Sequence, residues 1–358
     1  MRNNLTFRWV KYILKFNKPA GTSRGVLYDK ASYFIIVENN LGEIGIGECN
    51  IIPGLSPDDK PELEKHLEEI CKKAETTEDI SGLLPNGYPA LKFAFETALT
   101  DLNQNGSRIL YPSDFTNGKK FIEINGLVWM GDVDVMSRQL EDKVKNDFTC
   151  IKIKIGALNW QKELSFLKWI REKYSEKKLE IRVDANGAFT EKNVFSILDD
   201  LAKLKIHSIE QPIAAGNYDL MSKVCKNSPV DIALDEEIIG VKNRGFKEEL
   251  LSIIKPQYII LKPSLIGGFS ETSSWVSLCQ QHKIKWWVTS ALESNIGLSA
   301  IAQWTALQET TMPQGLGTGK IYTNNITSPL YLDGPKLGYN REINWDIPFL
   351  NLKKSVNQ

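Results

Sequence analysis

Five short apolar segments, each ending at a charged residue, recur at nearly even spacing through the middle of this 358-residue chain. The charged residues are Lys154, Asp184, Glu210, Asp235 and Lys262, and successive members lie 25 to 30 positions apart. That spacing matches one strand, a loop, a helix and a second loop. If each segment is a strand of a parallel barrel, all five charges lie at the C-terminal rim, where such barrels carry their active sites.

Alternating strands and helices predict a barrel domain over residues 119–319. Strands are predicted at 121–126, 150–155, 179–184, 207–211, 231–235, 257–262 and 284–289. The clearest helical patterns lie at 133–146, 160–173, 190–204, 269–282 and 294–308. Seven strands and a short eighth near 315–318 favour an α/β fold, a (β/α)7β TIM-like barrel. An open, doubly wound parallel sheet is the alternative.

Residues 1–118 follow a different pattern and predict an N-terminal α+β capping domain. Residues 5–16 alternate apolar and polar side chains, as a half-buried strand does. Two further strand-like runs flank a turn at Asn39–Gly42, and helical patterns follow. Residues 320–358 are rich in proline and glycine, and we expect this tail to return to the capping domain and complete it.

Composition narrows the classes of partner. The 44 basic and 44 acidic residues cancel, so no bulk charge favours nucleic acid or a membrane surface. No apolar run of about 18 residues is present to span a bilayer, and the N-terminal residues do not resemble a signal peptide. Five scattered cysteines indicate reduced thiols. We expect a cytoplasmic protein with a small-molecule substrate; a homo-oligomer is compatible with the sequence.

The three acids among the rim charges predict a metal site. Asp184, Glu210 and Asp235 each end an apolar run, and carboxylate oxygens are hard ligands that suit Mg²⁺. The chain has only three histidines, so a histidine-based zinc site is not expected. The alternative is that these acids cap helices or pair with arginine.

The lysines predict a base. Lys152 and Lys154 lie two apart on one strand, so both side chains point to the same side of the sheet. Two neighbouring ammonium groups lower each other's pKa, and a nearby dication lowers both, which leaves one lysine able to act as a neutral base. A solvent-facing strand is the alternative. With a metal, this set supports removal of a proton next to a carboxylate.

Five short motifs together resemble the enolase superfamily, in its muconate-lactonising subgroup. They are Lys152-x-Lys154, Asp184-x-Asn186, Glu210-Gln211-Pro212, Asp235-Glu236 and Lys262-Pro263, in that order. The resemblance implies Mg²⁺, for which Mn²⁺ can substitute, held by Asp184, Glu210 and Asp235. It also implies that Lys154 is a catalytic base, that Lys262 faces it from the other side of the ligand, and that Lys152 assists at the substrate carboxylate or tunes Lys154.

The loops carry the evidence on substrate. Arg24, in the loop Gly21–Gly25, offers a cation for a second carboxylate, and Asn186 is a further candidate substrate contact. Ser290 and Glu293 lie where the seventh strand ends and a helix begins, whose backbone N–H groups could bind an anion. The small residues of Gly315–Gly319 leave room for a succinyl arm.

These loops look like those of o-succinylbenzoate synthases within the subgroup. That resemblance implies dehydration of 2-succinyl-6-hydroxy-2,4-cyclohexadiene-1-carboxylate in menaquinone biosynthesis. The alternatives are an N-succinylamino acid racemase or dipeptide epimerase with the same site. The Asp-x-Asp usual in the epimerases is absent, which counts against a peptide substrate. A barrel that binds an anion without turnover and a Schiff-base aldolase are the alternatives from other classes.

Overall fold

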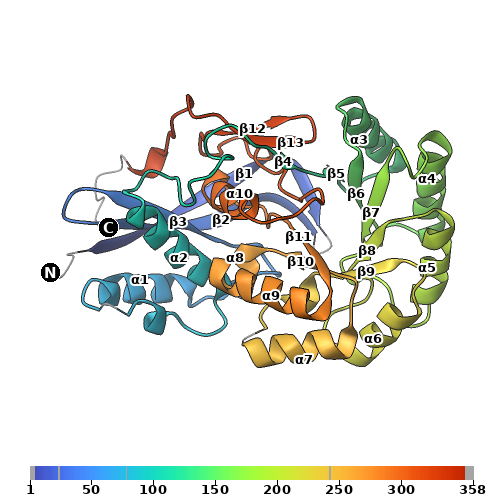
Figure 1. Ribbon diagram of the computed structural model, residues 1–358, viewed down its shortest axis with the longest axis horizontal. Coiled ribbons are helices and arrows are strands. Elements are labelled where there is room, and N and C mark those ends of the chain that lie inside the picture. The colour runs from blue at the N-terminus through green and yellow to red at the C-terminus, as the bar shows by residue number, and fades with distance from the viewer. Residues whose placement is uncertain (1–4, 23–24, 78, 242, 351–358) are drawn as a thin grey trace.

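The computed structural model describes residues 5–22, 25–77, 79–241 and 243–350. Its N-terminal part is an antiparallel sheet in the order β1 (Thr6–Thr22), β2 (Gly25–Glu38) and β3 (Ile44–Asn50). Helices α1 (Leu63–Ala74) and α2 (Pro89–Asn103) lie beside this sheet (Figure 1).

Alternation along β2 directs its side chains to two different cores. Ile35 and Val37 pack with the apolar residues of α1 and α2. Phe34 and Ile36 face the other way and pack with Ile296, from a barrel helix, and with residues of the tail. Because successive side chains of a strand point to opposite faces, one face of β2 packs on the helices of the cap and the other face packs on the barrel and the tail.

Two glycines of β3 allow α2 to lie directly on the strand backbone. A Cβ atom added to Gly45 would stand 2.1 Å from the carbonyl oxygen of Ala98, and one added to Gly47 would stand 1.9 Å from that of Ala94. No larger residue fits at this helix–strand contact without moving the helix.

The second part is a curled sheet of seven parallel strands, in the order β11-β10-β9-β8-β7-β6-β5. These strands are β5 (Gly126–Val128), β6 (Cys150–Lys154), β7 (Glu180–Asp184), β8 (Ser208–Glu210), β9 (Asp231–Leu234), β10 (Tyr258–Leu261) and β11 (Lys285–Val288). The eighth strand is reduced to two bridging residues, since Gly315 pairs with Thr289 and Gln314 pairs with Ile124. These bridges join the two edges, so the predicted TIM-like barrel with an N-terminal cap is confirmed.

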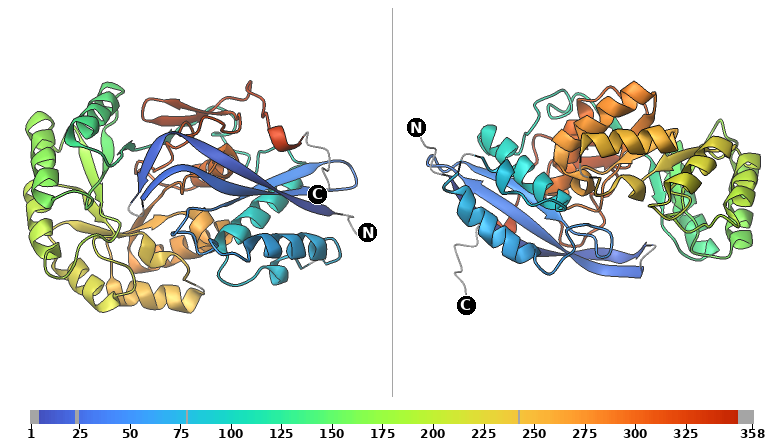
Figure 2. Two further views of the ribbon diagram at one scale, coloured as in Figure 1. Left: turned by 180° about the vertical axis from the view of Figure 1, so that it is seen from behind. Right: turned by 90° about the horizontal axis from the view of Figure 1, so that it is seen from below.

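Helices cover the outside of the sheet (Figures 1 and 2). They are α3 (Val133–Lys145), α4 (Trp160–Lys173), α5 (Val194–Lys203), α6 (Tyr218–Asn227), α7 (Arg244–Ile254), α8 (Pro263–Ile266), α9 (Gly268–His282) and α10 (Asn295–Ala306). Short 3-10 turns lie at Ser81–Leu83 between α1 and α2, at Glu236–Ile238 after β9 and at Pro348–Leu350 in the tail. The sequence pattern did not single out α6 and α7. None of the helices in the described ranges is long and apolar enough to cross a membrane.

The prediction of one strand at 121–126 is wrong in detail. Residues 122–123 form β4 (Ile122–Glu123), which pairs antiparallel with β13 (Lys336–Tyr339) of the tail, and β12 (Leu330–Asp333) completes that small sheet. The parallel pairing with β6 begins only at Gly126. The backbone of Ile124 donates to the carbonyl of Pro335, so the tail takes up hydrogen bonds that a longer barrel strand would use.

The tail also contacts the cap. The N–H of Thr323 donates to the carbonyl of Lys15 at 2.9 Å, and the Phe349 ring stacks on Phe34 with centroids 4.3 Å apart. The predicted domain boundaries, near residues 118 and 319, stay a prediction.

Candidate active site

The strand register brings the predicted charges to one rim. Lys154 on β6 pairs with Asp184 on β7, and Asp184 pairs with Glu210 on β8. Asp235 directly follows β9, and Lys262 directly follows β10. All five positions therefore end neighbouring parallel strands on the same side of the barrel.

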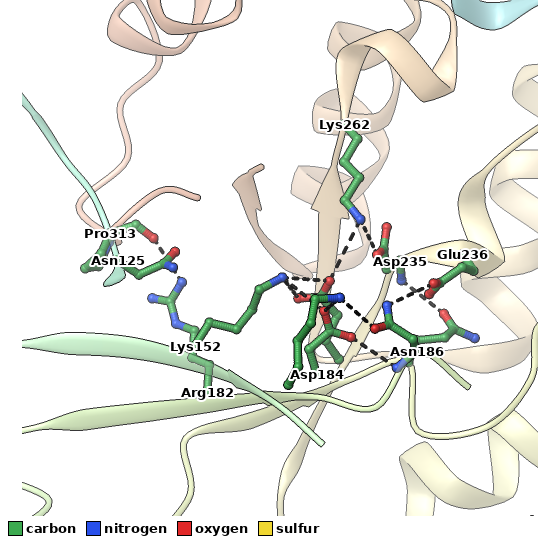
Figure 3. Close-up of polar contacts among 12 residues, drawn as sticks. Asn125, Lys152, Arg182, Asp184, Asn186, Asp235, Glu236, Lys262 and Pro313 are labelled. Carbon is green, nitrogen blue, oxygen red and sulfur yellow. Dashed lines mark hydrogen bonds and ion pairs between the residues drawn. The ribbon is translucent and has the colours of Figure 1, made fainter. Parts of the chain in front are cut away.

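Lysine ammonium groups lie among the three carboxylates (Figure 3). The Lys152 Nζ atom is 3.2 Å from Asp184 Oδ2 and 3.0 Å from Glu210 Oε2. The Lys262 Nζ atom donates to Asp235 Oδ2 and lies 4.0 Å from Glu210 Oε1. Figure 3 shows Lys152 and Lys262 reaching the acids from different directions.

Lys154 stands slightly apart from this cluster. Its Nζ atom donates to Asn186 Oδ1 at 2.7 Å and is 3.4 Å from Asp184 Oδ2. Asn186 in turn donates from Nδ2 to Glu236 Oε1 at 3.1 Å. Asn186 has a positive φ of 44°, a conformation in which asparagine is enriched among non-glycine residues.

Burial and charge act against each other on the acids. Burial alone would raise the pKa of Asp184, but the ammonium groups of Lys154, Lys152 and Lys262 outweigh it and hold that pKa low. For Glu210, burial dominates and, with the Asp184 charge, raises the pKa to about 8. Burial likewise raises the pKa of Asp235. The three carboxyls thus differ in how readily they ionise.

The carboxylates also act on the pKa values of Lys152 and Lys262. Burial would lower the pKa of Lys152, yet the Glu210, Asp184 and Asp235 carboxylates together raise it. The pKa of Lys262 is also raised, because Asp235 and Glu210 outweigh its burial. The acids around Lys152 thus dominate over the neighbouring lysine, and the lowering expected beside a dication stays a prediction.

A cavity of about 740 Å³ opens above this rim. Its polar floor includes Lys152, Lys154, Asp184, Asn186 and Lys262. Its walls are mostly apolar and come from the cap, from the strand ends of the barrel and from the residues after the eighth strand, among them Phe16, Ile52, Leu55, Trp129, Leu292 and Ile321. This volume is in the usual range for small-molecule sites.

Ser290 lines the cavity, but its hydroxyl is engaged within the protein. It donates to Glu293 Oε2 at 2.6 Å and accepts from the Thr318 hydroxyl at 2.8 Å. Glu293 is fully buried and also accepts from the Ser264 hydroxyl and from the backbone of Ala291, so it supports the cavity wall from behind. Arg24 lies outside the described residues. Direct substrate contact by these three residues stays a prediction.

The start of α10 is already occupied by an internal anion. Glu48, on β3 of the cap, accepts from the Ser294 N–H at 2.9 Å, the Ser294 hydroxyl at 2.6 Å and the Gly297 N–H at 3.0 Å. The expectation that these N–H groups bind a substrate anion is therefore wrong. They hold the cap against the barrel instead.

Comparison with known proteins identifies the family. A family model described as "Enolase C-terminal domain-like" matches residues 135–329. The chain is 45% identical to the o-succinylbenzoate synthase of Desulfotalea psychrophila over 356 residues, covering 91% of this chain and 96% of that enzyme. The chain belongs to the enolase superfamily. The identity of 45% extends this membership beyond the matched barrel to nearly the whole chain.

Solved structures of the superfamily agree with this fold. The crystal structure of MenC from Desulfotalea psychrophila matches with a TM-score of 0.84 and 40% identity, covering 94% of this chain and 99% of that one. A dipeptide epimerase from Cytophaga hutchinsonii, complexed with Mg and a dipeptide, matches with a TM-score of 0.81 over 98% of both chains. At 20% identity, that second likeness supports the shared fold alone.

The residues present fit the Mg²⁺ that superfamily enzymes use. Three buried carboxylates supply hard oxygen donors, and Asp235 Oδ1 is buried without a hydrogen-bond partner. In the described ranges, no group of three or more acidic, histidine or cysteine side chains stands in ligating geometry. The reason is visible in the contacts: Lys152 and Lys262 lie between the acids, so holding an ion requires the carboxylates to turn from these lysines.

Sequence reasoning quoted Gln211 in a motif but gave it no role. Its buried amide accepts from the N–H groups of Asp235 and Glu237, at 3.1 and 3.2 Å, and donates to the carbonyl of Ile213 and to Glu237 Oε2, both at 3.0 Å. All four hydrogen-bonding positions of the amide are used. Gln211 thus joins the ends of β8 and β9, which carry two of the superfamily's candidate metal ligands. In the sequence, the position of Gln211 directly after Glu210 is the feature that could have indicated this supporting role.

Proposed function

We propose that this protein is an o-succinylbenzoate synthase, a hydro-lyase that dehydrates 2-succinyl-6-hydroxy-2,4-cyclohexadiene-1-carboxylate in menaquinone biosynthesis. The observation that carries the proposal is the 45% identity to the Desulfotalea psychrophila enzyme across nearly the full length of both chains. The rim of acids and lysines supports it, because that chemistry needs a base beside a site for a carboxylate. Five free, buried cysteines support a reducing, cytoplasmic setting.

Asp184, Glu210 and Asp235 would hold Mg²⁺, or Mn²⁺ in its place. The ion would supply positive charge to the substrate's carboxylate oxygens, where negative charge grows as the ring proton leaves. Proton transfer and binding of the substrate carboxylate are assigned to side chains of the protein.

Lys154 is the residue we assign as the base. It lines the cavity, and its shortest contact is with a neutral amide, that of Asn186, rather than with a carboxylate. Lys152 is less suited to accept a proton, because the surrounding carboxylates raise its pKa and keep it as an ammonium ion. Lys152 therefore suits binding of the substrate carboxylate, the assisting role implied by the family resemblance.

The reaction balances with one proton carrier. Lys154 takes the proton from the ring carbon next to the carboxylate, which breaks the C–H bond. The resulting ammonium group then gives a proton to the departing hydroxyl, so that the C–O bond breaks, water leaves and the ring becomes aromatic. Lys262, placed across the rim, supplies a second positive charge near the ring.

A racemase or epimerase acting on N-acylated amino acids is the second candidate. One relative, the D-Ala-D/L-Ala epimerase of Cytophaga hutchinsonii, is 26% identical over 83% of this chain. Epimerisation also starts with proton removal next to a carboxylate, so the same floor would serve it. The missing Asp-x-Asp after the eighth strand weighs against dipeptides.

Purified protein with Mg²⁺ tests the two functions side by side. We expect the diene absorbance of the cyclohexadiene substrate to disappear, with o-succinylbenzoate as the product. Incubation in D₂O with N-succinylamino acids and with dipeptides reports deuterium at Cα. Dehydration slower than this exchange, or no dehydration at all, would overturn the proposal. Borohydride in the presence of substrate checks for a Schiff base and should trap none.

A further inference from the structure

A lysine pair stands at the cavity mouth, where the end of β1 meets the residues after the eighth strand. Phe16 forms an antiparallel bridge with Tyr322, and their rings lie with centroids 4.7 Å apart. The Asn17 N–H donates to the carbonyl of Ile321 at 2.8 Å, and the Asn17 side chain donates to the carbonyl of Lys320 at 2.6 Å.

Lys18 and Lys320 lie beside this contact: Lys18 follows Asn17, and Lys320 supplies the carbonyl to which the Asn17 side chain donates. Both lysines are exposed and both line the cavity. Within the described ranges, neither has an ion pair with a carboxylate. Two cations at the edge of one cavity, neither paired with a carboxylate in the described part of the chain, make this position suited to an anion.

The rest of the cavity indicates which kind of ligand would bind at this site. The floor of the same cavity holds Lys152, Lys154 and Lys262, so one carboxylate of a substrate can be bound there. The wall between floor and mouth includes the apolar side chains of Leu292 and Ile321. A ligand that fits both ends carries two carboxylates separated by an apolar arm.

We propose that Lys18 and Lys320 bind the distal carboxylate of the substrate, that of the succinyl arm. The inference rests on the proposed function. The two ammonium groups add to each other at one carboxylate, whereas either alone would be a solvated surface charge. The site selects substrates by their far end and takes no part in proton transfer.

Binding of two probes to the full-length enzyme tests the proposal. The probes are o-succinylbenzoate and the analogue whose succinyl carboxylate is a primary amide, titrated by calorimetry at low salt. Wild type should prefer the acid by on the order of tenfold, and the double variant K18Q/K320Q should bind both probes equally. In turnover, the double variant should raise KM about tenfold and leave kcat within about twofold.

A matched variant separates this site from general charge effects. K223Q/K226Q removes two exposed lysines from α6, away from the cavity, and should leave the preference for the acid intact. If K18Q/K320Q keeps the wild-type preference, or the control loses it equally, the inference is wrong even when the enzyme dehydrates the diene. Wild type that neither turns over the diene nor binds o-succinylbenzoate contradicts the proposed function, and this inference with it.

Discussion

Lys262 donates to one oxygen of the Asp235 carboxylate, while the other oxygen is buried without a partner. A buried acceptor left without a hydrogen bond costs free energy, on the order of 1–3 kcal/mol. Such an arrangement is expected where a cation completes the site. The same contact places a lysine at the edge of the candidate metal centre, so metal binding and the position of Lys262 are coupled.

Substitution of Asp235 by asparagine should therefore weaken metal binding. The change removes one negative charge and one ligand oxygen while keeping the side-chain shape. We expect the Kd for Mn²⁺, measured from the EPR signal of the free ion, to rise on the order of a hundredfold. Asp231→Asn, at the exposed opposite end of the same strand, should leave the Kd unchanged. Wild-type affinity in Asp235→Asn would show that this carboxylate is not a ligand.

Loss of the Lys154 amine should slow turnover strongly and leave ligand binding largely intact. General base catalysis contributes typically 10²- to 10⁴-fold, so Lys154→Ala should lower kcat by at least about a hundredfold. The affinity for o-succinylbenzoate should change less than about tenfold, because Lys152 and Lys262 remain at the floor. Lys168→Ala, at an exposed position of α4, is the control. A similar loss of kcat in both variants would remove Lys154 from its assigned role.

Barrel and rim could be predicted because their signals are local and repeat. Each strand is a short apolar run ending in a charge, so Lys154, Asp184 and Glu210 could be aligned by spacing alone. The eighth strand was harder to place, since only Gln314 and Gly315 form bridges there. Helices α6 and α7 were not singled out.

Contacts between distant segments could not be predicted in the same way. Nothing in the local sequence shows that Glu48 accepts from Ser294 and Gly297, which lie about 250 residues later. The carboxylates that surround Lys152 could not be predicted for a related reason. The sequence places Lys154 two positions away, whereas the opposing charges of Glu210 and Asp184 are brought close only by folding.

Asp58 should make the stability of the cap depend on pH. Burial raises its pKa to about 7, although it accepts from the N–H groups of Ala90 and Leu91 at the start of α2. The pKa in the unfolded chain is near its ordinary value of about 3.9. The folded state therefore binds the proton more tightly, so this contribution to stability is present below about pH 4 and is lost as the pH rises to about 7.

Urea unfolding of wild type and Asp58→Asn between pH 4.5 and pH 7.5 checks this. Between these two pH values the unfolding free energy of wild type should fall, relative to the variant, by about 3 kcal/mol. Asp59→Asn, at the exposed neighbouring position, should follow wild type. Parallel pH profiles for wild type and Asp58→Asn would contradict the raised pKa.

Glu48 should hold the cap to the barrel through its charge and its four acceptor contacts. Its Oε1 atom accepts from the Ser32 hydroxyl and the Ser294 N–H, and its Oε2 atom accepts from the Ser294 hydroxyl and the Gly297 N–H. Glutamine keeps the shape but turns one acceptor into a donor, which then faces other donors. It also removes a negative charge from the N-terminus of α10.

Glu48→Gln should therefore lower the free energy of unfolding by about 2–4 kcal/mol, measured with a chemical denaturant. Hydrogen exchange should speed up at the Ser294 and Gly297 amides, because they donate to different oxygens of Glu48 and glutamine keeps only one acceptor oxygen. Glu123→Gln, at an exposed position on β4, removes the same charge and should alter neither measurement. If Glu48→Gln keeps both wild-type stability and slow exchange at the start of α10, then contacts other than those of Glu48 hold the interface, among them the packing of Phe34 and Ile36.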